Sequence, residues 1–502
     1  MLFNSYEFLF LFLPIVVIGY RLLARFGRTI IAITWLALAS YVFYLSGETL
    51  YPWMLAGSIL FNFVTGRWIE RAENPRRKRL LIFGVVGNLA LLGFFKYSNF
   101  TVSQFVALGI LDASTWAIVL PIGISFFTFT QIAYLADVAA RKTSSPDIVR
   151  YGLFVSYFPH LIAGPILHNK EMLPQFEHPG VRRLSVDLYA GLGMFAIGLA
   201  KKVLLADPCG AVASGVFGTT DSPPGFYVAW VGTIAYTLQI YFDFSGYSDM
   251  AIGISRMLGI DLPINFNSPY KSRSILEFWR RWHITLSRFL RDYLYIPLGG
   301  NRKGEARRFV NLFTTMLLGG IWHGAGWTFV IWGGMHGAAQ TIAHGWVAIG
   351  KHRRLPRIPG WLGWPITMIF VMFAWVPFRS ADLTVMMRMW SAMLGGAGFD
   401  VPAIGIAKPL LIFGGSSVPV NFGSPAILTM AGAALVALLA PNSQQIMARF
   451  DMGLDSPGYL ARGRPSRITL RMGWFSCLFV GILLGLAIRS IGGYSEFIYF
   501  QF

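Results

Sequence analysis

The sequence is poor in charged residues. Only 13% of its 502 residues are Asp, Glu, Lys or Arg, whereas 55% are hydrophobic. A soluble domain carries about 25% charged residues, and no long polar stretch separates the apolar runs of this chain. The composition therefore excludes an independent soluble domain and predicts an all-α polytopic membrane protein. Residues 1–502 are predicted to form a single integral-membrane domain.

Cysteine is also scarce. The two cysteines, Cys209 and Cys477, lie far apart in the sequence. Two such residues form no disulfide framework and have no spacing typical of a metal site. No internal repeat is visible either, although many transporters are built from one. The chain thus lacks the sequence features of a disulfide-rich secreted protein and of a repeat-built transporter.

Acidic residues are few, which leaves a strong positive balance. The chain has 42 Lys and Arg against 23 Asp and Glu, a net charge of +19. In a soluble protein this excess would suggest nucleic acid as a partner. Here the basic residues cluster in short loops between apolar runs, as the positive-inside rule describes. The charge therefore follows from topology, and no nucleic acid partner is predicted.

The loops also predict an orientation. Arg21, Arg25 and Arg28 flank the first loop, the second loop (45–50) has no Lys or Arg, and the third (71–79) is basic again. Basic loops are cytoplasmic, so the N-terminus is expected to face outward. The apolar run from Phe8 is interpreted as a retained first span, because no basic residue precedes it.

The apolar runs predict roughly 11–12 transmembrane helices, since about 20 apolar residues cross a bilayer. Shorter pieces at 98–112, 151–167, 275–293 and 382–395 suit interfacial or re-entrant helices. The predicted spans are 8–24, 29–46, 50–66, 80–95, 115–138, 185–205, 226–258, 309–323, 327–346, 360–378, 423–441 and 472–490.

His323 lies deep inside one of these runs. Fourteen steps from Phe309 at about 1.5 Å each place it roughly 21 Å along the helix, more than halfway through a hydrocarbon core of about 30 Å. A titratable ring at that depth usually faces a cavity or a partner. The stretches Gly319-Gly320 and Gly324-Ala325-Gly326 are expected to interrupt the span. They favour a cavity there over the alternative, close packing of small residues.

A second histidine, His283, lies in a basic and aromatic segment, 275–293, which is predicted to be an amphipathic helix at the membrane interface. Lys271, Arg280 and Arg281 could hold the phosphates of a cytosolic donor. A membrane-surface helix without further function explains the same pattern, and the sequence does not separate the two.

The remaining candidates are Asp243, Tyr247 and Asp249, which lie in an otherwise apolar span, and His336, 13 residues after His323. The carboxylates could orient a histidine or a substrate hydroxyl, or they could form a buried polar network between helices. His336 could be a second catalytic group, an orienting partner or a packed side chain. No metal site is predicted, because the spacing of these residues is not diagnostic of one.

Several segments together resemble the membrane-bound O-acyltransferase (MBOAT) family, most closely its bacterial alginate O-acetyltransferase-like branch. The resemblance implies that His323 is the central catalytic histidine and that His283 occupies the second polar position. It also implies a helical fold with a thinned centre and a tunnel, with 268–345 as the catalytic core segment. The matching segments are 1–5, 120–126, 158–165, 242–249, 277–283, 298–302, 322–324 and 499–502.

The resemblance implies transfer of acetyl groups across a bacterial inner membrane. The expected donor is acetyl-CoA or another acyl thioester on the cytosolic side, with no bound cofactor. The expected acceptor is a hydroxyl of an exported, alginate-like polysaccharide, reached directly or through a periplasmic acetyltransferase or export partner. His323 would take the hydroxyl proton, an effect typically worth 10²–10⁴-fold in rate. His283 is the expected hydrogen-bond donor to the oxyanion.

Other functions remain open at this point. The same fold could transfer D-alanyl groups to teichoic acid or acyl groups to peptidoglycan or cellulose. A transporter or flippase of an acyl or lipid-linked group would use His323 as a proton relay. A scaffold in a polysaccharide-export complex would not need His323 at all.

Overall fold

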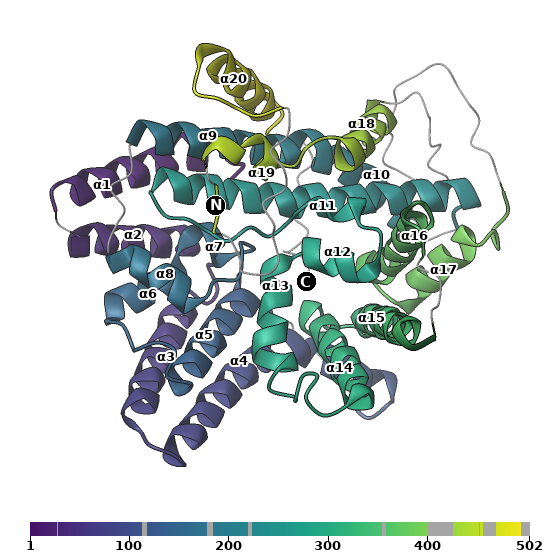
Figure 1. Cartoon of the computed structure of the whole chain (residues 1–502), viewed down its shortest axis with the longest axis horizontal. Helices are drawn as coiled ribbons and strands as arrows, with labels where there is room; N and C mark the ends of the chain where they lie inside the picture. The colour runs from purple at the N-terminus through teal and green to yellow at the C-terminus, as the bar shows by residue number, and fades with distance from the viewer. Residues whose placement is uncertain are drawn as a thin grey trace. The chain divides into compact units, whose positions relative to one another are not determined.

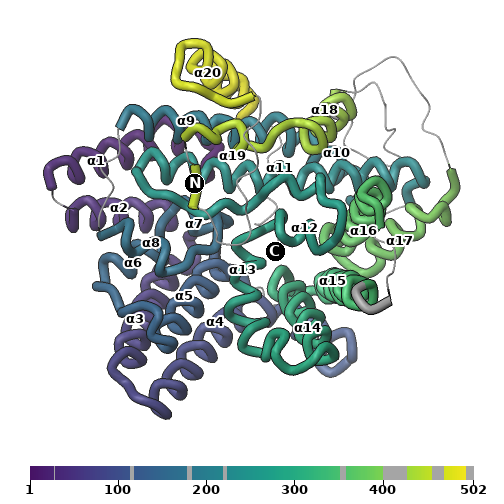
Figure 2. Tube along the Cα trace, viewed as in Figure 1, coloured from purple at the N-terminus to yellow at the C-terminus, as the bar shows by residue number. Residues whose placement is uncertain are grey.

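The fold is known from a computed structural model. Every regular element among the described residues is a helix, apart from one isolated β-bridge between Pro263 and Leu454. The all-α prediction is therefore confirmed (Figures 1 and 2). The described residues are 1–27, 29–112, 118–177, 184–218, 223–353, 358–399, 425–450, 452–454 and 468–492. The C-terminal motif at 499–502 lies outside them.

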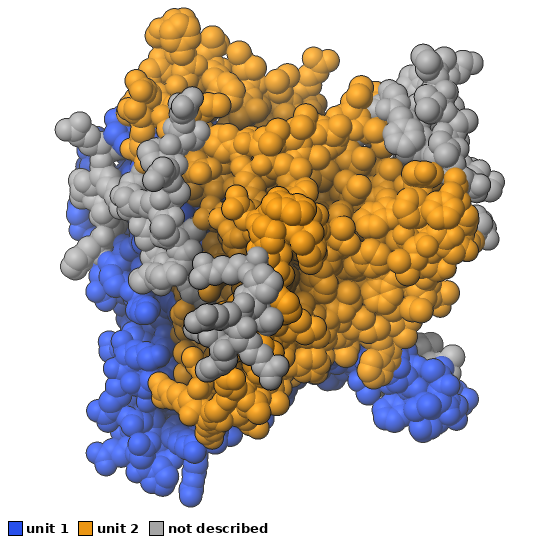
Figure 3. Space-filling model, turned by 45° about the vertical axis from the view of Figure 1, so that its right-hand side comes forward, with its two compact units in different colours: residues 1–195, 248–264, 450–456 blue, residues 196–247, 265–449, 457–502 orange. Residues whose placement is uncertain are grey.

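The chain divides into two compact units, coloured separately in Figure 3. The first comprises residues 1–195, 248–264 and 450–456, and the second comprises 196–247, 265–449 and 457–502. The predicted catalytic core segment, 268–345, lies wholly in the second unit. The prediction of a single domain is not tested by this division and stays a prediction.

In the first unit α1 packs on α2, and α3, α4 and α5 pack on one another. Helix α5 is buried on almost all sides, including its polar residues Ser125, Thr128, Thr130, Gln131 and Asp137. Helix α4 instead leaves large apolar side chains exposed, which suits a helix that faces lipid. The helices are η1 (Phe8–Phe12), α1 (Leu13–Arg25), α2 (Thr29–Leu45), α3 (Met54–Arg71), α4 (Arg76–Ala107), α5 (Ile124–Ala139), α6 (Ile148–Ser156), α7 (Phe158–Leu161) and α8 (Asn169–Glu177).

Three elements contribute residues to both units: α9 (Leu184–Ala200), α11 (Phe226–Met257) and the turn η5 (Ala448–Phe450). In the second unit α15 packs on α14, α16 and α12. Its other elements are η2 (Lys201–Ala206), α10 (Asp207–Phe217), η3 (Pro269–Lys271), α12 (Ile275–Arg281), α13 (Ile284–Leu290), η4 (Arg291–Tyr295), α14 (Glu305–His323), α15 (Trp327–Arg353), α16 (Gly360–Arg379), α17 (Leu383–Met393), α18 (Pro425–Leu439), α19 (Ser443–Ile446) and α20 (Trp474–Arg489).

Within the described part of the chain, length and hydropathy together identify four segments able to cross a membrane: Phe8–Arg25, Arg76–Ala107, Leu184–Phe217 and Gly360–Arg379. Shorter apolar helices cover Thr29–Leu45, Ile124–Ala139, Ile427–Leu439 and Trp474–Arg489. The predicted break near residue 95 is wrong, because α4 continues without interruption to Ala107. The predicted start of a span at 115 lies outside the described residues, and α5 begins at Ile124.

Candidate active site

His323 is the last residue of α14, which packs closely against α15. Two glycines permit this approach. A Cβ on Gly320 would lie 2.5 Å from the carbonyl oxygen of Phe329, and one on Gly333 would lie 2.8 Å from that of Met316. The expectation that Gly319–Gly320 interrupts the span is therefore wrong, since α14 runs through both. Small residues here allow helix packing, and the break comes only at 324–326, between α14 and α15.

The His323 ring is buried, with 5% of the residue exposed. Three aromatic rings contact it: Trp322 at 4.8 Å between centroids, Trp332 at 5.0 Å and Phe378 at 5.1 Å. Trp332 comes from α15 and Phe378 from α16, so three helices meet at this histidine. Such a setting excludes bulk water and strengthens any electrostatic interaction made there.

His283 lies between two helices rather than inside one. Helix α12 ends at Arg281 and α13 begins at Ile284, and His283 has φ +42°, in the left-handed region that non-glycine residues rarely adopt. The segment 265–267 holds this conformation. The amide of Ile284 donates to the carbonyl of Asn265 at 3.0 Å, and the amide of Asn267 donates to the carbonyl of Arg281 at 2.9 Å.

The side chain of Asn265 fixes the His283 ring. Its Oδ1 accepts from the amide of Thr285 at 3.2 Å and from the Thr285 hydroxyl at 2.9 Å, which identifies that atom as the acceptor. His283 Nδ1 lies 3.1 Å from the same oxygen and therefore carries a proton that it donates. Nε2 is buried and has no hydrogen-bond partner among the described residues.

The protonation state of His283 follows from its burial. The residue is 1% exposed, and burial lowers its pKa to about 3, so the ring is neutral at pH 7. The single proton of a neutral imidazole is on Nδ1, which leaves a lone pair on Nε2. These bonds favour His283 as a proton or hydrogen-bond acceptor, whereas the sequence-based expectation was a donor to the oxyanion.

The sequence analysis expected the aromatic residues around His283 to lie at the membrane interface. The structure contradicts this expectation. Phe278, Trp279 and Trp282 are buried, and residues 275–293 form the short helices α12 and α13 and the start of η4 instead of one amphipathic helix. The rings form a continuous cluster that links the two histidines. The centroid distances along it are 6.5 Å (His283–Phe266), 5.1 Å (Phe266–Trp282), 5.0 Å (Trp282–Trp375), 5.4 Å (Trp375–Phe378) and 5.1 Å (Phe378–His323).

His336 belongs to the same cluster. It is fully buried, and its ring lies 4.8 Å from that of Trp332, which also contacts His323. The indole N–H of Trp279 donates to His336 Nδ1 at 3.2 Å. Because an indole nitrogen is only a donor, Nδ1 is the unprotonated nitrogen and Nε2 carries the proton. The structure thus brings His336 beside the predicted site and leaves its chemical role a prediction.

Asp243 forms a buried ion pair. Lys202 Nζ lies 2.8 Å from Asp243 Oδ1 and 2.7 Å from Asp207 Oδ1. This pairing ties α11 to η2 and α10, which fits the alternative of a polar network between helices. Tyr247 is also buried in the second unit, whereas Asp249 is buried in the first. The role of Asp249 stays a prediction.

The predicted donor-binding residues differ in their surroundings. Lys271 Nζ donates to the carbonyl of Ala440 at 2.6 Å. Arg281 pairs with Glu277 at 2.8 Å and donates to the carbonyl of Asn267 at 3.2 Å. Arg280 is exposed at the end of α12. Of the three, Arg280 is the side chain that the fold leaves at the surface.

Sequence reasoning missed three residues of this site. Lys202 carried a signal, since a lysine within an apolar run needs a buried partner, and Asp243 is that partner. Trp332 lies next to the glycines that precede His336 and is indistinguishable in sequence from a lipid-facing tryptophan. Asn265 gives no local signal, because it bonds to a histidine 18 residues away.

Among the described residues, no group of three or more His, Cys, Asp and Glu side chains has the geometry to hold a metal ion.

Comparison with known proteins identifies the family. The profile of the membrane-bound O-acyltransferase family, MBOAT, matches residues 29–386. The chain is 43% identical over 431 residues to "Peptidoglycan O-acetyltransferase" of Helicobacter pylori, covering 80% of this chain and 81% of that protein. It is 40% identical to "Probable alginate O-acetylase AlgI" of Pseudomonas aeruginosa over the full length of both chains. "Teichoic acid D-alanyltransferase" of Streptococcus thermophilus is 28% identical over 256 residues, 46% of this chain and 60% of that protein. The predicted family and the predicted acyltransferase activity are confirmed.

Proposed function

The chain belongs to the membrane-bound O-acyltransferase family, and from this premise we propose that it transfers acetyl groups to hydroxyls of an exported polysaccharide. The names of the full-length relatives, alginate O-acetylases, support an alginate-like acceptor. We place the chain in the bacterial inner membrane as a multi-pass protein, with its N-terminus outward. Its basic loops and apolar helices support this topology.

The donor is a cytosolic acyl thioester, for which acetyl-CoA is the first choice and a carrier-protein thioester the second. The acceptor oxygen attacks the thioester carbonyl carbon, and its proton passes to the imidazole of His323. The C–S bond then breaks, and the leaving thiolate takes up a proton. A positioned base of this kind typically contributes 10²–10⁴-fold to the rate.

His283 supplies a second acceptor. Its neutral Nε2 can receive a hydrogen bond from the attacking hydroxyl or from an amide N–H of the thioester arm, and so positions one of them. The observation that carries the proposal is this pair of buried histidines in one aromatic cluster, one of them oriented by Asn265. Lys271, Arg280 and Arg281 attract the phosphates of the donor, and exposed Arg280 is the first of them that a cytosolic molecule meets.

The acetyl group reaches the polymer directly or through a periplasmic acetyltransferase or export partner. The similarity to the peptidoglycan O-acetyltransferase supports a second acceptor, peptidoglycan, within the same reaction class. The D-alanyltransferases match less than half of this chain, and they support the D-alanyl alternative less strongly.

The test is the O-acetyl content of surface polysaccharide in cells that carry the wild type or His323→Ala, with membrane levels matched by blot. We expect acetylation to fall by at least about 10²-fold. His344→Ala is the matched control, because His344 lies on α15 and bonds to Arg308; it should leave acetylation normal. Full acetylation with His323→Ala would refute the proposal and favour the transporter or scaffold alternatives.

A further inference from the structure

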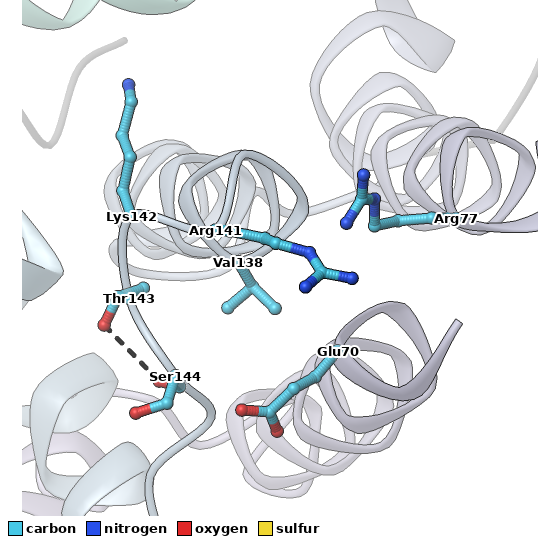
Figure 4. Close-up of a pocket in the computed structure, with 7 residues that line it drawn as sticks. All are labelled: Glu70, Arg77, Val138, Arg141, Lys142, Thr143 and Ser144. Atoms are coloured by element: carbon cyan, nitrogen blue, oxygen red, sulfur yellow. Dashed lines mark hydrogen bonds between the residues drawn. The ribbon is translucent and has the colours of Figure 1, made fainter. Parts of the chain in front are cut away.

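The first unit contains a cavity of about 420 Å³ that shares no residue with the histidine site. It lies where α3 ends, α4 begins and the chain leaves α5. Figure 4 shows the guanidinium groups of Arg77 and Arg141 facing each other across this space, with the carboxylate of Glu70 beside them. The ammonium group of Lys142 points away. Two guanidinium groups that face one space favour an anion between them, since each offers planar, charge-assisted donors.

Arg77 gives the second indication of an anion. Its Nη1 is enclosed by the protein and has no hydrogen-bond partner among the described residues. A charged donor in that position is costly unless a partner is supplied. Arg77 also lies in the first turn of α4, which has no acidic residue and no side-chain cap. Cations there oppose the helix dipole, whereas an anion would be stabilised by the dipole and by the arginines together.

The wall opposite α4 is held in a fixed conformation. Glu70 Oε1 accepts from the amide of Ser145 at 3.0 Å, and Thr143 Oγ1 accepts from Asn169 Nδ2 at 3.1 Å. Lys142 lies 3.5 Å from Asp137. The loop that carries Arg141 is therefore anchored to α3 through Glu70 and to α8 through Asn169. An anion would meet a preformed site.

The surroundings of the cavity indicate which anion it takes. Trp68 on α3 and Ile82 and Phe83 on α4 are each about half exposed. Ile82 is five residues beyond Arg77, about 7.5 Å along the helix. Exposed apolar and indole side chains beside a basic cluster are typical of the level at which lipid headgroups lie. We propose that this cavity binds the phosphate of an anionic phospholipid headgroup, whose acyl chains lie along the apolar faces of α3 and α4.

The test uses the full-length protein purified in neutral detergent, with thermal stability and binding measured against added phosphatidylglycerol, phosphatidylcholine or inorganic phosphate. We expect phosphatidylglycerol to stabilise the wild type more than phosphatidylcholine does. Arg77→Gln combined with Arg141→Gln should weaken phosphatidylglycerol binding at least tenfold. Glu70→Gln should tighten it, because the variant removes the competing negative charge and keeps an acceptor for Ser145.

The matched control is Arg79→Gln, which removes an exposed arginine of the same helix turn that does not line the cavity; binding should stay within twofold of the wild type. Equal binding by the double variant and no gain from Glu70→Gln would overturn the proposal. Stabilisation by inorganic phosphate but not by phosphatidylglycerol would show that the cavity takes free phosphate, and it would overturn the proposal of a lipid ligand. Glu70→Gln keeps the test decisive should the double variant fail to fold. None of these readouts depends on acyl transfer, so their outcome is independent of the proposed reaction.

Discussion

His283 and His336 are two fully enclosed histidines in one aromatic cluster, and their neighbours give them opposite properties. Asn265 presents an oxygen to Nδ1 of His283, so the proton is on Nδ1 and the lone pair on Nε2. Trp279 presents an N–H to Nδ1 of His336, so the proton is on Nε2. Both Nε2 atoms are buried and lack hydrogen-bond partners among the described residues. Burial alone therefore does not determine whether Nε2 accepts or donates a hydrogen bond. The group bonded to Nδ1 determines it.

This difference also separates two structural settings. His283 lies in a strained backbone conformation between helices, and residues held this way cluster at functional sites. His336 lies in the middle of α15, surrounded by the rings of Phe278, Trp279, Trp332 and Phe370. The backbone conformation at His283 orients its side chain, whereas the His336 ring packs among its aromatic neighbours. The comparison predicts that the two histidines contribute unequally to catalysis.

The largest expected effect comes from replacing each histidine with phenylalanine. His283→Phe should lower the rate of acetyl transfer by about 10²-fold or more, since it removes the Nε2 acceptor that Asn265 orients. His336→Phe should lower it less than tenfold, because phenylalanine retains most of the packing in that aromatic surrounding. Transfer from radiolabelled acetyl-CoA in membranes with matched protein levels measures both. Equal losses would show that the opposite hydrogen bonds do not matter for the reaction.

Much of the fold could be predicted from the sequence because its determinant is local. Apolar runs of about 20 residues predict helices, and the helices at 29–45, 360–379 and 474–489 lie close to the predicted bounds. The errors occur where a contact with a residue far away in the sequence determines the local backbone conformation. His283 adopts a left-handed conformation without a glycine, since segment 265–267 bonds to both sides of it. Gly319–Gly320 continues a helix because α15 packs against it, and no pattern within α14 reveals that neighbour.

The sequence allowed candidate site residues to be named, but it did not reveal which nitrogen of each histidine carries the proton. His323 could be named because a titratable ring deep within an apolar run is unusual, whereas the role of His283 was implied by the family resemblance of segment 277–283. Which nitrogen of His283 carries the proton depends on the Asn265 side chain, and that contact exists only in the folded chain. The predicted interfacial edge at 275–293 failed for a similar reason. Tryptophan and phenylalanine suit a lipid interface and a packed interior equally well.

A smaller effect is expected from Asn265→Asp, which keeps the acceptor oxygen and adds a charge. A carboxylate bonded to Nδ1 favours the imidazolium, so it should raise the pKa of His283 from about 3 toward neutrality. The protonated ring has no lone pair on Nε2, and activity should fall as the pH falls through the raised pKa. The acid limb of the pH profile of kcat/KM should move to higher pH. Thr285→Val, which removes one hydroxyl from the same oxygen, should leave that limb in place. An unmoved limb in Asn265→Asp would mean that His283 does not take part as a neutral acceptor.

The pH dependence of stability provides a related check on the wild type. An unfolded chain protonates His283 near pH 6.5, whereas the folded chain protonates it only near pH 3. The unfolded state therefore binds more protons between these values, and the contribution of His283 to stability falls as the pH falls from 6.5 to 3. In Asn265→Asp this loss should be smaller, since the folded and unfolded pKa values lie closer together. Thermal unfolding of both proteins across this pH range compares them.

The smallest expected effect is the loss of the indole donor to His336. Trp279→Phe keeps an aromatic ring in the cluster but leaves Nδ1 of His336 without a partner, which should reduce the free energy of unfolding by about 1 kcal/mol. Trp332→Phe is the matched control, since the indole N–H of Trp332 is buried and has no hydrogen-bond partner among the described residues. Both substitutions shrink a ring of the same kind in the same cluster, so the difference between their thermal shifts isolates the hydrogen bond. A smaller shift for Trp279→Phe than for Trp332→Phe would show that packing alone holds His336, and its Nε2 proton would then not be fixed by Trp279.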